Sequence, residues 1–438
     1  MNHSTRKLVW LRLCLLFLSI GLSSPIHAEM SPPPPFLPSD SILHHPPLAG
    51  QGFRTQFLGR EVTIPAMDRR SLNAWVAGTT INFPKPSGRR LEPLAALYFW
   101  RRPNQDRLFY ADIAGVYNHL FFSQAFESGK ALEWVTTFEN YTIPFLKQTE
   151  IIEGHQDKAA EVEWGYVRPG FGLGFRQPVA PFRQDNMAAV DFIIEPGFLY
   201  FGRHDRHQGF VKPRDTFELR TRVQLKWDAL TRNFMNLVDT GFAFGADGVW
   251  GHRARWRDWG INAQERGHNS YALVTAYGVG SIRLPFANSG RHRLIGSAFG
   301  GIGHHMDRFD RSVTQRLGGG VNPVGEEFHT LGNPVLPGAA YLEFFPRHYL
   351  LAYGEYRFAA NFFTFLHFYG GGAYLDPQRI KNGKIRREDT FMPFAGARIT
   401  TGLPGNMRLV IDYAHNFGLK RRGQGFGNQV TLWISRLF

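Results

Sequence analysis

Apolar and polar residues alternate along most of the chain, and this two-residue repeat is the period of a β-strand. The clearest segment is 216–228, where the odd-numbered positions from Phe217 to Trp227 lean apolar and the even-numbered positions from Glu218 to Asp228 are strongly polar. Such a strand has one apolar face and one densely charged face. A transmembrane β-barrel needs this arrangement because its strands meet lipid outside and a polar lumen inside.

Segments with this pattern, separated by turn residues, recur from residue 72 to the C-terminus. We expect strands at 72–84, 92–101, 107–121, 131–142, 159–176, 187–203, 216–228, 236–250, 270–284, 292–304, 336–346, 347–360, 361–374, 390–403, 406–415 and 427–438. Their number is even, as is usual for bacterial outer-membrane barrels. The pattern therefore predicts an all-β fold, a transmembrane antiparallel β-barrel of about 16 strands.

The first residues have the organisation of a secretory signal peptide. Basic residues precede the apolar stretch 13–22, and Ala28 offers a small residue for cleavage. We therefore expect residues 1–28 to be removed on export. Export together with the barrel pattern indicates the cell outer membrane. Cys14 is the only cysteine of the chain and lies in this segment. The mature protein is therefore expected to have no disulfide and no thiol nucleophile.

Two further regions are expected after the signal peptide. Residues 29–71 begin with a proline-rich stretch and are expected to form an extended lead. Residues 72–438 are the expected barrel. The longest stretch of the barrel without a strand pattern lies near 305–335, and a loop of that length is usually functional.

The chain is basic, with 50 Lys and Arg against 36 Asp and Glu and a formal net charge of +14. Export argues against nucleic acid as the partner of this charge. The basic excess is expected instead to bind the phosphates of lipopolysaccharide or to line a lumen. Alternatively, the arginines pair with the 36 acidic residues across a polar interior, which would explain most of the arginines. Lys381, Lys384, Arg386 and Arg387 form a cluster between two late strands, either an extracellular patch for lipopolysaccharide or a solvated loop.

The last strand carries a signal of its own. Phe438, Ile434 and Leu432 share one face of the final segment. A terminal Phe on an alternating strand resembles the signal by which outer-membrane barrels are recognised for insertion. The expected partners are outer-membrane lipid and lipopolysaccharide, with other outer-membrane proteins or the barrel-assembly machinery as further candidates. No cofactor is expected.

Three stretches between residues 316 and 438 carry the motifs of a known barrel family. The first stretch is a loop motif followed by a strand with E-Y-R-F. The second is a strand with Phe and Gly at alternate positions. The third is a pair of closing strands, one with G-x-R and the other with R-x-D-Y-A. The residues are Leu336, Pro337, Gly338 and Ala339 in the loop, and Glu355, Arg357, Phe368, Gly370, Gly372, Arg398 and Asp412 in the wall. This region resembles the bacterial surface-antigen superfamily, which includes the BamA-type assembly barrels and the two-partner-secretion transporters.

The resemblance implies a sixteen-strand barrel whose long loop, about residues 305–338, folds into the lumen and braces the wall. It also implies a role in assembling or translocating proteins or lipids, through a weak seam between the strands 72–84 and 427–438. In the family a loop Arg contacts a strand Asp, whereas Pro337 and Gly370 stand at these positions here. Family members also carry periplasmic modules, and only about forty residues separate the expected cleavage site from the first expected strand.

Two other functions stay open. A passive porin-like channel would use an arginine-rich lumen to favour anionic solutes. An outer-membrane lipid-modifying enzyme would need a His and a Ser at the outer rim, and the segment 267–270 contains His268 and Ser270, although not in the order that such enzymes use. We rank the enzyme below the assembly barrel and the channel, and we expect no catalytic residue.

One cluster has the side-chain types of a metal site. His304, His305, Asp307 and Asp310 lie within seven residues at the start of the long loop. Adjacent histidines on a strand point to opposite faces, which argues against joint ligation. No metal is therefore expected.

Overall fold

The computed structural model describes residues 47–86, 90–115, 117–141, 147–148, 151–156, 160–180, 186–202, 209–263, 265–284, 290–319, 331–381 and 384–437. The expected signal peptide and Phe438 lie outside these residues. Within the described part of the chain, no helix is long and apolar enough to cross a membrane.

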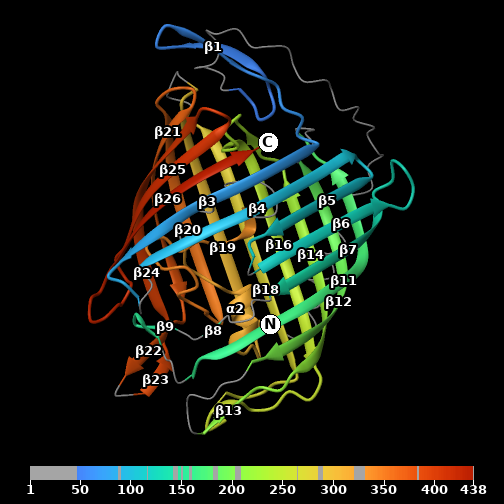
Figure 1. Cartoon of the computed structure of the whole chain (residues 1–438), viewed down its shortest axis with the longest axis vertical. Coiled ribbons are helices and arrows are strands. Elements are labelled where there is room, and N and C mark those ends of the chain that lie inside the picture. Colours follow the sequence, from blue (N-terminus) through green and yellow to red (C-terminus); the bar gives the residue numbers. More distant parts are fainter. Residues whose placement is uncertain are drawn as a thin grey trace, which may run out of the picture.

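Sixteen long strands form one closed antiparallel barrel (Figure 1). They are β3 (Ser71–Phe83), β4 (Leu91–Asn104), β5 (Arg107–Ile113), β6 (Tyr117–Ala125), β7 (Leu132–Tyr141), β11 (Val162–Pro178), β12 (Met187–Phe201), β14 (Thr216–Asp228), β16 (Val238–Arg253), β18 (Ser270–Arg283), β19 (His292–His304), β20 (His348–Ala359), β21 (Thr364–Leu375), β24 (Thr390–Leu403), β25 (Met407–Asn416) and β26 (Gly427–Leu437). Each pairs with its successor, and β26 pairs with β3 to close the ring. The predicted fold class is confirmed.

Shorter elements complete the described structure. They are β1 (Phe53–Phe57), β2 (Arg60–Ile64), β8 (Lys147–Gln148), β9 (Ile151–Ile152), β10 (His155–Gln156), β13 (Phe210–Val211), β15 (Thr231–Arg232), β17 (Gly260–Ile261), β22 (Gln378–Lys381), β23 (Lys384–Arg387) and the helix α2 (Arg308–Thr314). β1 pairs with β2, β9 with β10, β13 with β17 and β22 with β23. β8 and β15 extend the pairing of the wall.

The two ends of the barrel differ in their connections. β3 begins and β26 ends at the upper end in Figure 1, which we call the terminal end. Turns there are short, such as 404–406 between β24 and β25, whereas the opposite loop end carries long connections such as 305–347 between β19 and β20. Outer-membrane barrels have short periplasmic turns and long extracellular loops. This asymmetry assigns the loop end to the outside of the cell.

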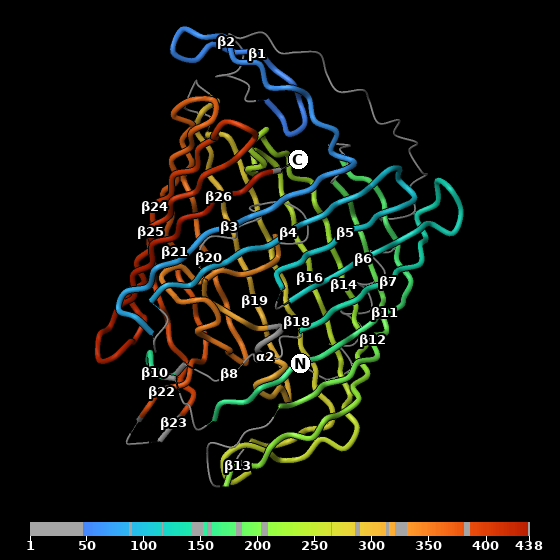
Figure 2. The backbone as a smooth tube through the Cα atoms, in the orientation of Figure 1, coloured from blue at the N-terminus to red at the C-terminus, as the bar shows by residue number. Residues whose placement is uncertain are grey.

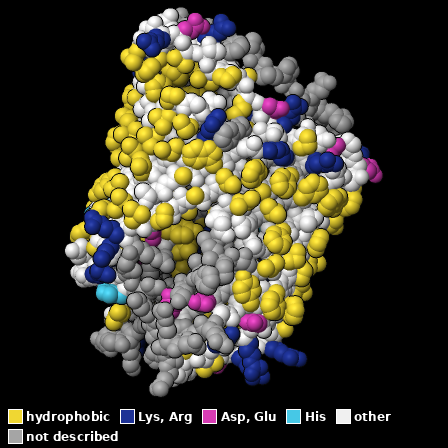
Figure 3. All heavy atoms as spheres, viewed as in Figure 1, with side chains coloured by type: hydrophobic (Ala, Val, Ile, Leu, Met, Phe, Trp, Pro, Cys, Tyr) yellow, Lys and Arg dark blue, Asp and Glu magenta, His cyan; other side chains and the backbone are white. Residues whose placement is uncertain are grey.

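Apolar side chains cover the outward face of the wall. Phe192, Leu219 and Val223 are each 46% exposed on neighbouring strands. Figure 3 shows hydrophobic side chains spread over the visible wall. Because inward positions on the same strands hold charged residues, the wall has the apolar outside and polar inside of a transmembrane barrel.

Two of the expected strands differ from the structure, and the two differences cancel in the strand count. The expected strand 107–121 is two strands, because Gly115 has a φ of +76° and turns the chain between β5 and β6. The expected strand 336–346 was wrong. These residues form irregular chain in the lumen, where Pro337 and Pro346 lack the N–H groups that a ladder needs.

The seam between β26 and β3 is fully paired. Ten residue pairs run without interruption from Asn428 opposite Phe83 to Leu437 opposite Ala74. The join between β25 and β26 also has ten pairs, whereas β4 and β5 share only six, with an irregularity between Arg101 and Asn104. The expectation of few inter-strand bonds at the seam is therefore wrong for this conformation.

Part of the expected lead 29–71 forms a hairpin over the terminal end. β1 and β2 lie beside that end in Figure 2. Phe53 is fully buried and packs edge-on against Phe234, at 5.0 Å between ring centroids, and against Phe362, at 5.8 Å. Both partners lie in turns of the barrel, so one aromatic side chain attaches the hairpin to two separate turns.

We expect Phe53→Ala to detach this hairpin. Loss of a buried Phe costs about 3–5 kcal/mol, more than a small two-stranded unit gains by itself. Trypsin should then cleave after Arg54 and Arg60 in the folded barrel faster than in the unmodified protein. Leu58→Ala is the matched control, because Leu58 is 86% exposed at the hairpin turn, and it should leave the cleavage rate unchanged. Equal rates in both variants would contradict this role of Phe53.

Candidate functional site

The long connection between β19 and β20 folds back into the barrel. We call its described residues, 305–319 and 331–347, the plug. Figure 1 shows α2 of the plug inside the ring of strands. Its sequence favours a helix start here: the Asp307 carboxylate accepts the N–H groups of Phe309 and Asp310, and the Asp310 carboxylate accepts the Asp307 N–H. This capping box satisfies the first N–H groups of a helix that would otherwise be too short to persist.

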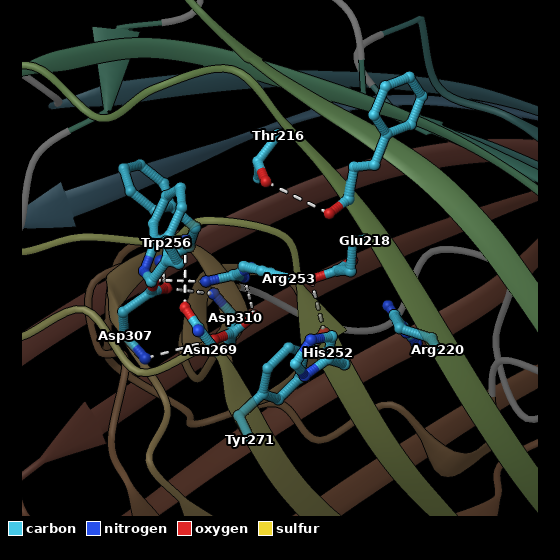
Figure 4. Close-up of polar contacts among 12 residues, drawn as sticks. Thr216, Glu218, Arg220, His252, Arg253, Trp256, Asn269, Tyr271, Asp307 and Asp310 are labelled. Atoms are coloured by element: carbon cyan, nitrogen blue, oxygen red, sulfur yellow. Dashed lines mark hydrogen bonds and ion pairs between the residues drawn. The ribbon is translucent and has the colours of Figure 1, made fainter.

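Arg253, at the loop end of β16, binds α2 to the wall. Its Nε donates to Glu218 of β14 at 2.9 Å, its Nη1 donates to Asp307 at 2.5 Å, and its Nη2 donates to Asp310 (Figure 4). Only 2% of the Arg253 side chain is exposed, and its guanidinium lies 4.6 Å from the centre of the Trp256 ring. One buried cation therefore joins the helix cap to two strands of the wall.

The network continues along the lumenal face of the wall. Glu218 also accepts a bond from Arg168 at 2.7 Å, and Arg168 donates to Glu139 at 2.8 Å. All of these side chains are buried. A buried ion pair that loses one partner leaves an uncompensated charge, which costs several kcal/mol. The network therefore makes removal of α2 from its site expensive.

An aromatic anchor completes the attachment of α2. Phe309 is 1% exposed, and its ring lies 5.0 Å from Trp164, 4.9 Å from Phe201 and 4.6 Å from Trp259. Trp164 and Phe201 belong to β11 and β12, whereas Trp259 belongs to the loop after β16. The helix is thus fixed to one side of the barrel by both charge and apolar packing.

The rest of the plug packs against a different part of the wall. Leu317 pairs with Phe344 in an isolated bridge that joins the two described halves of the plug. Leu317 and Leu336 are buried in one cluster with Leu351 of β20 and Met392 of β24. The plug therefore contacts β11 and β12 through α2 and contacts β20 to β25 through its second half.

The loop tip, residues 337–343, reaches the seam. Gln429 of β26 donates to the carbonyl oxygen of Ala339 at 2.5 Å and to Asn82 of β3 at 3.1 Å. Asn82 donates to Glu92 of β4 at 2.9 Å, and Glu92 accepts the N–H of Tyr341 at 2.9 Å. One hydrogen-bonded chain thus links the loop tip to both strands of the seam and to the strand beyond it.

A buried ion pair joins the same loop tip to the loop that follows β25. Arg421 follows β25, is fully buried and donates to Glu343 of the plug, at 2.8 Å from its Nε. It also donates to the carbonyl oxygens of Pro84, at 3.2 Å, and Gly338, at 3.3 Å. Pro84 follows β3, so this one guanidinium connects the plug with chain segments on both sides of the seam.

The loop motif and the lumenal wall residues that the sequence analysis singled out lie in different places. The loop motif Leu336, Pro337, Gly338 and Ala339 lies at the seam. In the wall, Arg398 binds Asp412 at 3.1 Å and Glu355 at 3.6 Å, and Arg357 binds Glu355 at 3.0 Å. These four wall residues form one lumenal charge cluster away from the loop motif.

Three expected wall residues face the other way. Phe368 is 54% exposed, and strand alternation places Gly370 and Gly372 on the same outward face. A side chain at position 370 would meet nothing nearer than a carbonyl oxygen at 3.5 Å. The proposed correspondence between Gly370 and the family's lumenal Asp is therefore corrected by the strand register. Tyr369 holds the inward position, and its hydroxyl donates to Asp412 at 3.0 Å.

The expected insertion signal is only partly described. Leu432 and Ile434 face outward, at 44% and 37% exposure, as the sequence pattern predicts for residues that meet lipid. Phe438 lies outside the described residues.

Sequence reasoning missed the residues that hold the plug. Asp307 and Asp310 had a signal, because Asp at a cap position with an acid three residues later marks a helix start. Arg253, Arg421 and Gln429 had none, since each is one polar residue among many on an inward strand face or in a loop. Their partners lie far away in sequence and become neighbours only through barrel closure.

The candidate enzyme and metal residues are arranged differently from the sequence hypotheses. Ser270 Oγ lies 2.8 Å from Nδ1 of His252, not of the neighbouring His268. The ring of His268 stacks on His305 at 4.1 Å. Asp307, proposed with the histidines, turns inward to Arg253. Among the described residues, no group of three or more His, Cys, Asp or Glu has the arrangement of a metal site.

The expected basic patch is partly committed to other contacts. Arg387 donates to the carbonyl oxygen of Phe345 at 3.2 Å, so it fixes the hairpin of β22 and β23 to the plug. Arg386 is exposed. The side chains of Lys381 and Lys384 lie outside the described part of the structure.

Comparison with known proteins supports the fold. No protein-family model matches this chain, and no curated protein matches it. Among solved structures, it resembles BamA from Haemophilus ducreyi lacking POTRA domains 1–3, with a TM-score of 0.51 and 12% identity over 86% of this chain and 72% of that chain. CdiB from Escherichia coli gives 0.45 and 11% over 90% and 68%, and OprB from Pseudomonas putida gives 0.41 and 8% over 84% and 94%.

The likeness to BamA shows a shared barrel fold, and the predicted similarity to BamA-type barrels is confirmed at that level. The protein is thus an outer-membrane β-barrel.

We expect Arg253→Met to release α2. The substitution removes the cation that binds Asp307, Asp310 and Glu218, which costs about 3–5 kcal/mol. Trypsin should then cut the folded protein after Arg311 in the plug. Arg222→Met is the matched control, because Arg222 binds Asp247 of the wall at 2.5 Å. Protection of Arg311 in the Arg253 variant would show that apolar packing alone retains the helix.

The histidine stack at the root of the plug should respond to pH. The pKa of His305 is lowered because the neighbouring rings shield it from water and because His268 and His304 add positive charge when protonated. The stack is therefore favoured above the ordinary histidine pKa of about 6.5 and is weakened as the pH falls below it. We expect His268→Gln to raise the pKa of His305, measured by NMR titration, and an unchanged value would contradict the coupling.

Proposed function

We propose that this barrel assembles or translocates proteins or lipids at the outer membrane, with a plugged lumen and a seam that opens under control of the plug. The observation that carries the proposal is the hydrogen-bonded chain from the loop tip through Gln429 and Asn82 to Glu92. A loop that bonds to both sides of one join is placed to stabilise the closed join. The BamA-type resemblance supports the role, since it implies assembly or translocation through this same seam.

The bonds at the seam favour a join that opens only when the plug moves, rather than a join that opens by itself because it has few bonds. Ten ladder pairs close the seam, and the loop tip adds side-chain bonds from Gln429, Arg421 and Glu343. Removing the plug would subtract its bonds to Gln429 and Arg421 and leave the ladder with the side-chain bonds between β3 and β26 themselves. An edge freed by opening could then pair with an incoming strand, which is the usual way for a sheet edge to bind an extended segment.

The charge pattern counts against a passive anion channel. The lumenal arginines of β11, β14 and β16 pair with acids: Arg168 with Glu139, Arg220 with Glu195, Arg222 with Asp247 and Arg253 with Glu218. A cation already paired with a buried carboxylate offers little attraction to a passing anion. These four lumenal arginines are therefore already paired within the wall itself.

We further propose that residues 1–28 direct export and are removed, and that lipid and lipopolysaccharide surround the barrel in the outer membrane. N-terminal sequencing of the membrane-inserted protein checks the cleavage, with Glu29 as the expected first residue.

A disulfide across the seam tests the proposal directly. Thr80 and Thr431 are opposite each other in the ladder, with hydroxyl oxygens 3.2 Å apart. In a protein with Cys14 replaced by Ser, Thr80→Cys with Thr431→Cys should form a bond that locks the seam. The readout is the rate at which a small unfolded barrel folds into vesicles that contain the protein. We expect the oxidised protein to lose its acceleration of folding and the reduced protein to regain it.

The wall offers a matched control. Thr364 and Thr401 are opposite each other between β21 and β24, with hydroxyl oxygens 2.9 Å apart. The same cysteine pair at that join should leave the activity unchanged, because β21 and β24 are not the seam. Equal inhibition by both disulfides, or no acceleration by the unlocked protein, would overturn the proposal.

Conductance separates the proposal from the channel. We expect low or flickering single-channel current from the intact barrel in a planar bilayer and a large, steady current after deletion of residues 312–334. Glu343→Gln should raise the open probability, because it removes the charge that Arg421 binds at the loop tip. A large, steady, anion-selective current in the intact protein would make it a porin-like channel.

A further inference from the structure

Exposed cations gather at the loop end of β12, β14 and β16. They lie in the two loops that follow β12 and β16, which β13 and β17 join through the pair Val211 and Gly260. Figure 3 shows Lys and Arg side chains at this lower end of the molecule. The exposed cations in the described parts of these loops are Lys212, Arg214, Arg255, Arg257 and Arg266.

The acids among them are few and partly engaged. Asp215 accepts the N–H of Phe201 at 2.9 Å, and Asp258 accepts the N–H of Gly267 at 2.8 Å. Glu265 is the third acid in the described residues of the two loops. The patch therefore keeps a net positive charge at the rim of the barrel.

An exposed apolar surface begins where the cations end. Phe217, the second residue of β14, is 71% exposed, and its ring lies 5.0 Å from that of Phe198 on β12. Trp250 of β16 is 49% exposed on the same outward face. Ala254 donates its N–H to the Phe217 carbonyl oxygen at 3.0 Å, so Arg255 directly follows a residue bonded to this apolar surface.

We propose that this rim binds a phosphorylated lipid of the outer leaflet, lipopolysaccharide, with its phosphates on the loop cations and its acyl chains along Phe198, Phe217 and Trp250. A soluble anion would use only the cations, and an uncharged lipid would use only the apolar surface. The two surfaces together fit an anionic amphiphile. Arginine binds phosphate through two parallel N–H bonds, and aromatic side chains are typical of the rims of such barrels.

The site also lies next to the anchor of the plug. Arg255 and Arg257 flank Trp256, whose ring lies 4.6 Å from the guanidinium of Arg253 and contacts Phe309 edge-on at 6.1 Å. Phosphate bound to the two arginines orders the loop segment that holds α2. The inference therefore deepens the proposed function, on which it rests for the role of the plug, by naming a lipid that favours the plugged state.

The experiment measures binding of deep-rough lipopolysaccharide to the refolded full chain in detergent, by calorimetric titration. The triple variant Arg214→Gln, Arg255→Gln, Arg257→Gln should bind at least about tenfold more weakly, since each basic residue near an anionic lipid surface contributes several-fold. Its control is the double variant Arg60→Gln, Lys130→Gln, which removes exposed cations from the terminal end and should leave the affinity unchanged. Arg386→Gln tests the basic hairpin of β22 and β23 and is expected to have no effect.

Further ligands distinguish the source of the anion. Lipopolysaccharide stripped of its phosphates should bind at least about tenfold more weakly, and inorganic pyrophosphate should not displace the intact lipid. Phe217→Ala with Trp250→Ala should also weaken binding of the lipid, because both substitutions remove exposed apolar side chains that the acyl chains contact. Equal loss in the Arg60 and Lys130 control, or equal affinity for the stripped lipid, would overturn the proposal. Displacement by pyrophosphate would also overturn it, because it would show a site for soluble anions.

The two proposals fail separately. A barrel locked by the Thr80 and Thr431 disulfide should still bind lipopolysaccharide with unchanged affinity. Loss of folding acceleration with intact lipid binding concerns the seam alone, whereas loss of lipid binding with intact folding acceleration concerns the rim alone.

Discussion

The absence of water from the bilayer core is the constraint on which this structure depends. Every backbone N–H and C=O group at that depth needs a partner within the protein, so a sheet survives there only as a closed ring. The ten pairs between β26 and β3 meet this requirement. Closure then places the inward faces of sixteen strands around one space, and the polar residues of these faces must satisfy one another.

The plug and the wall satisfy each other by buried charge. Arg253 is shared by Glu218 of the wall and the two acids of the helix cap, and Arg421 is shared by Glu343 and two carbonyl oxygens. Docking of the plug gives Arg253 two further carboxylates and gives Arg421 the carboxylate of Glu343. The same contacts that fill the lumen therefore also hold the seam, so the state of the plug and the state of the seam are coupled through named side chains.

Local sequence pattern was sufficient for the wall and insufficient for the lumen. The segment 216–228 is β14 as predicted, because the alternation of its side chains is a property of the strand itself. The loop 336–346 looked like a strand from its composition, and Gly370 was matched to a lumenal position one residue out of register. A shift of one residue exchanges the two faces of a strand, and a motif with several glycines leaves that register weakly marked.

The sequence by itself determined the class of fold, the outward apolar face and the charge that the interior must neutralise. Each of these follows from residues that are neighbours in the chain. Only the tertiary structure decided that Arg253 meets Asp307, that Gln429 meets Ala339 and that the loop tip lies at the seam. These contacts join residues far apart in the chain, and no local pattern specifies them because any inward polar residue would satisfy the strand equally well.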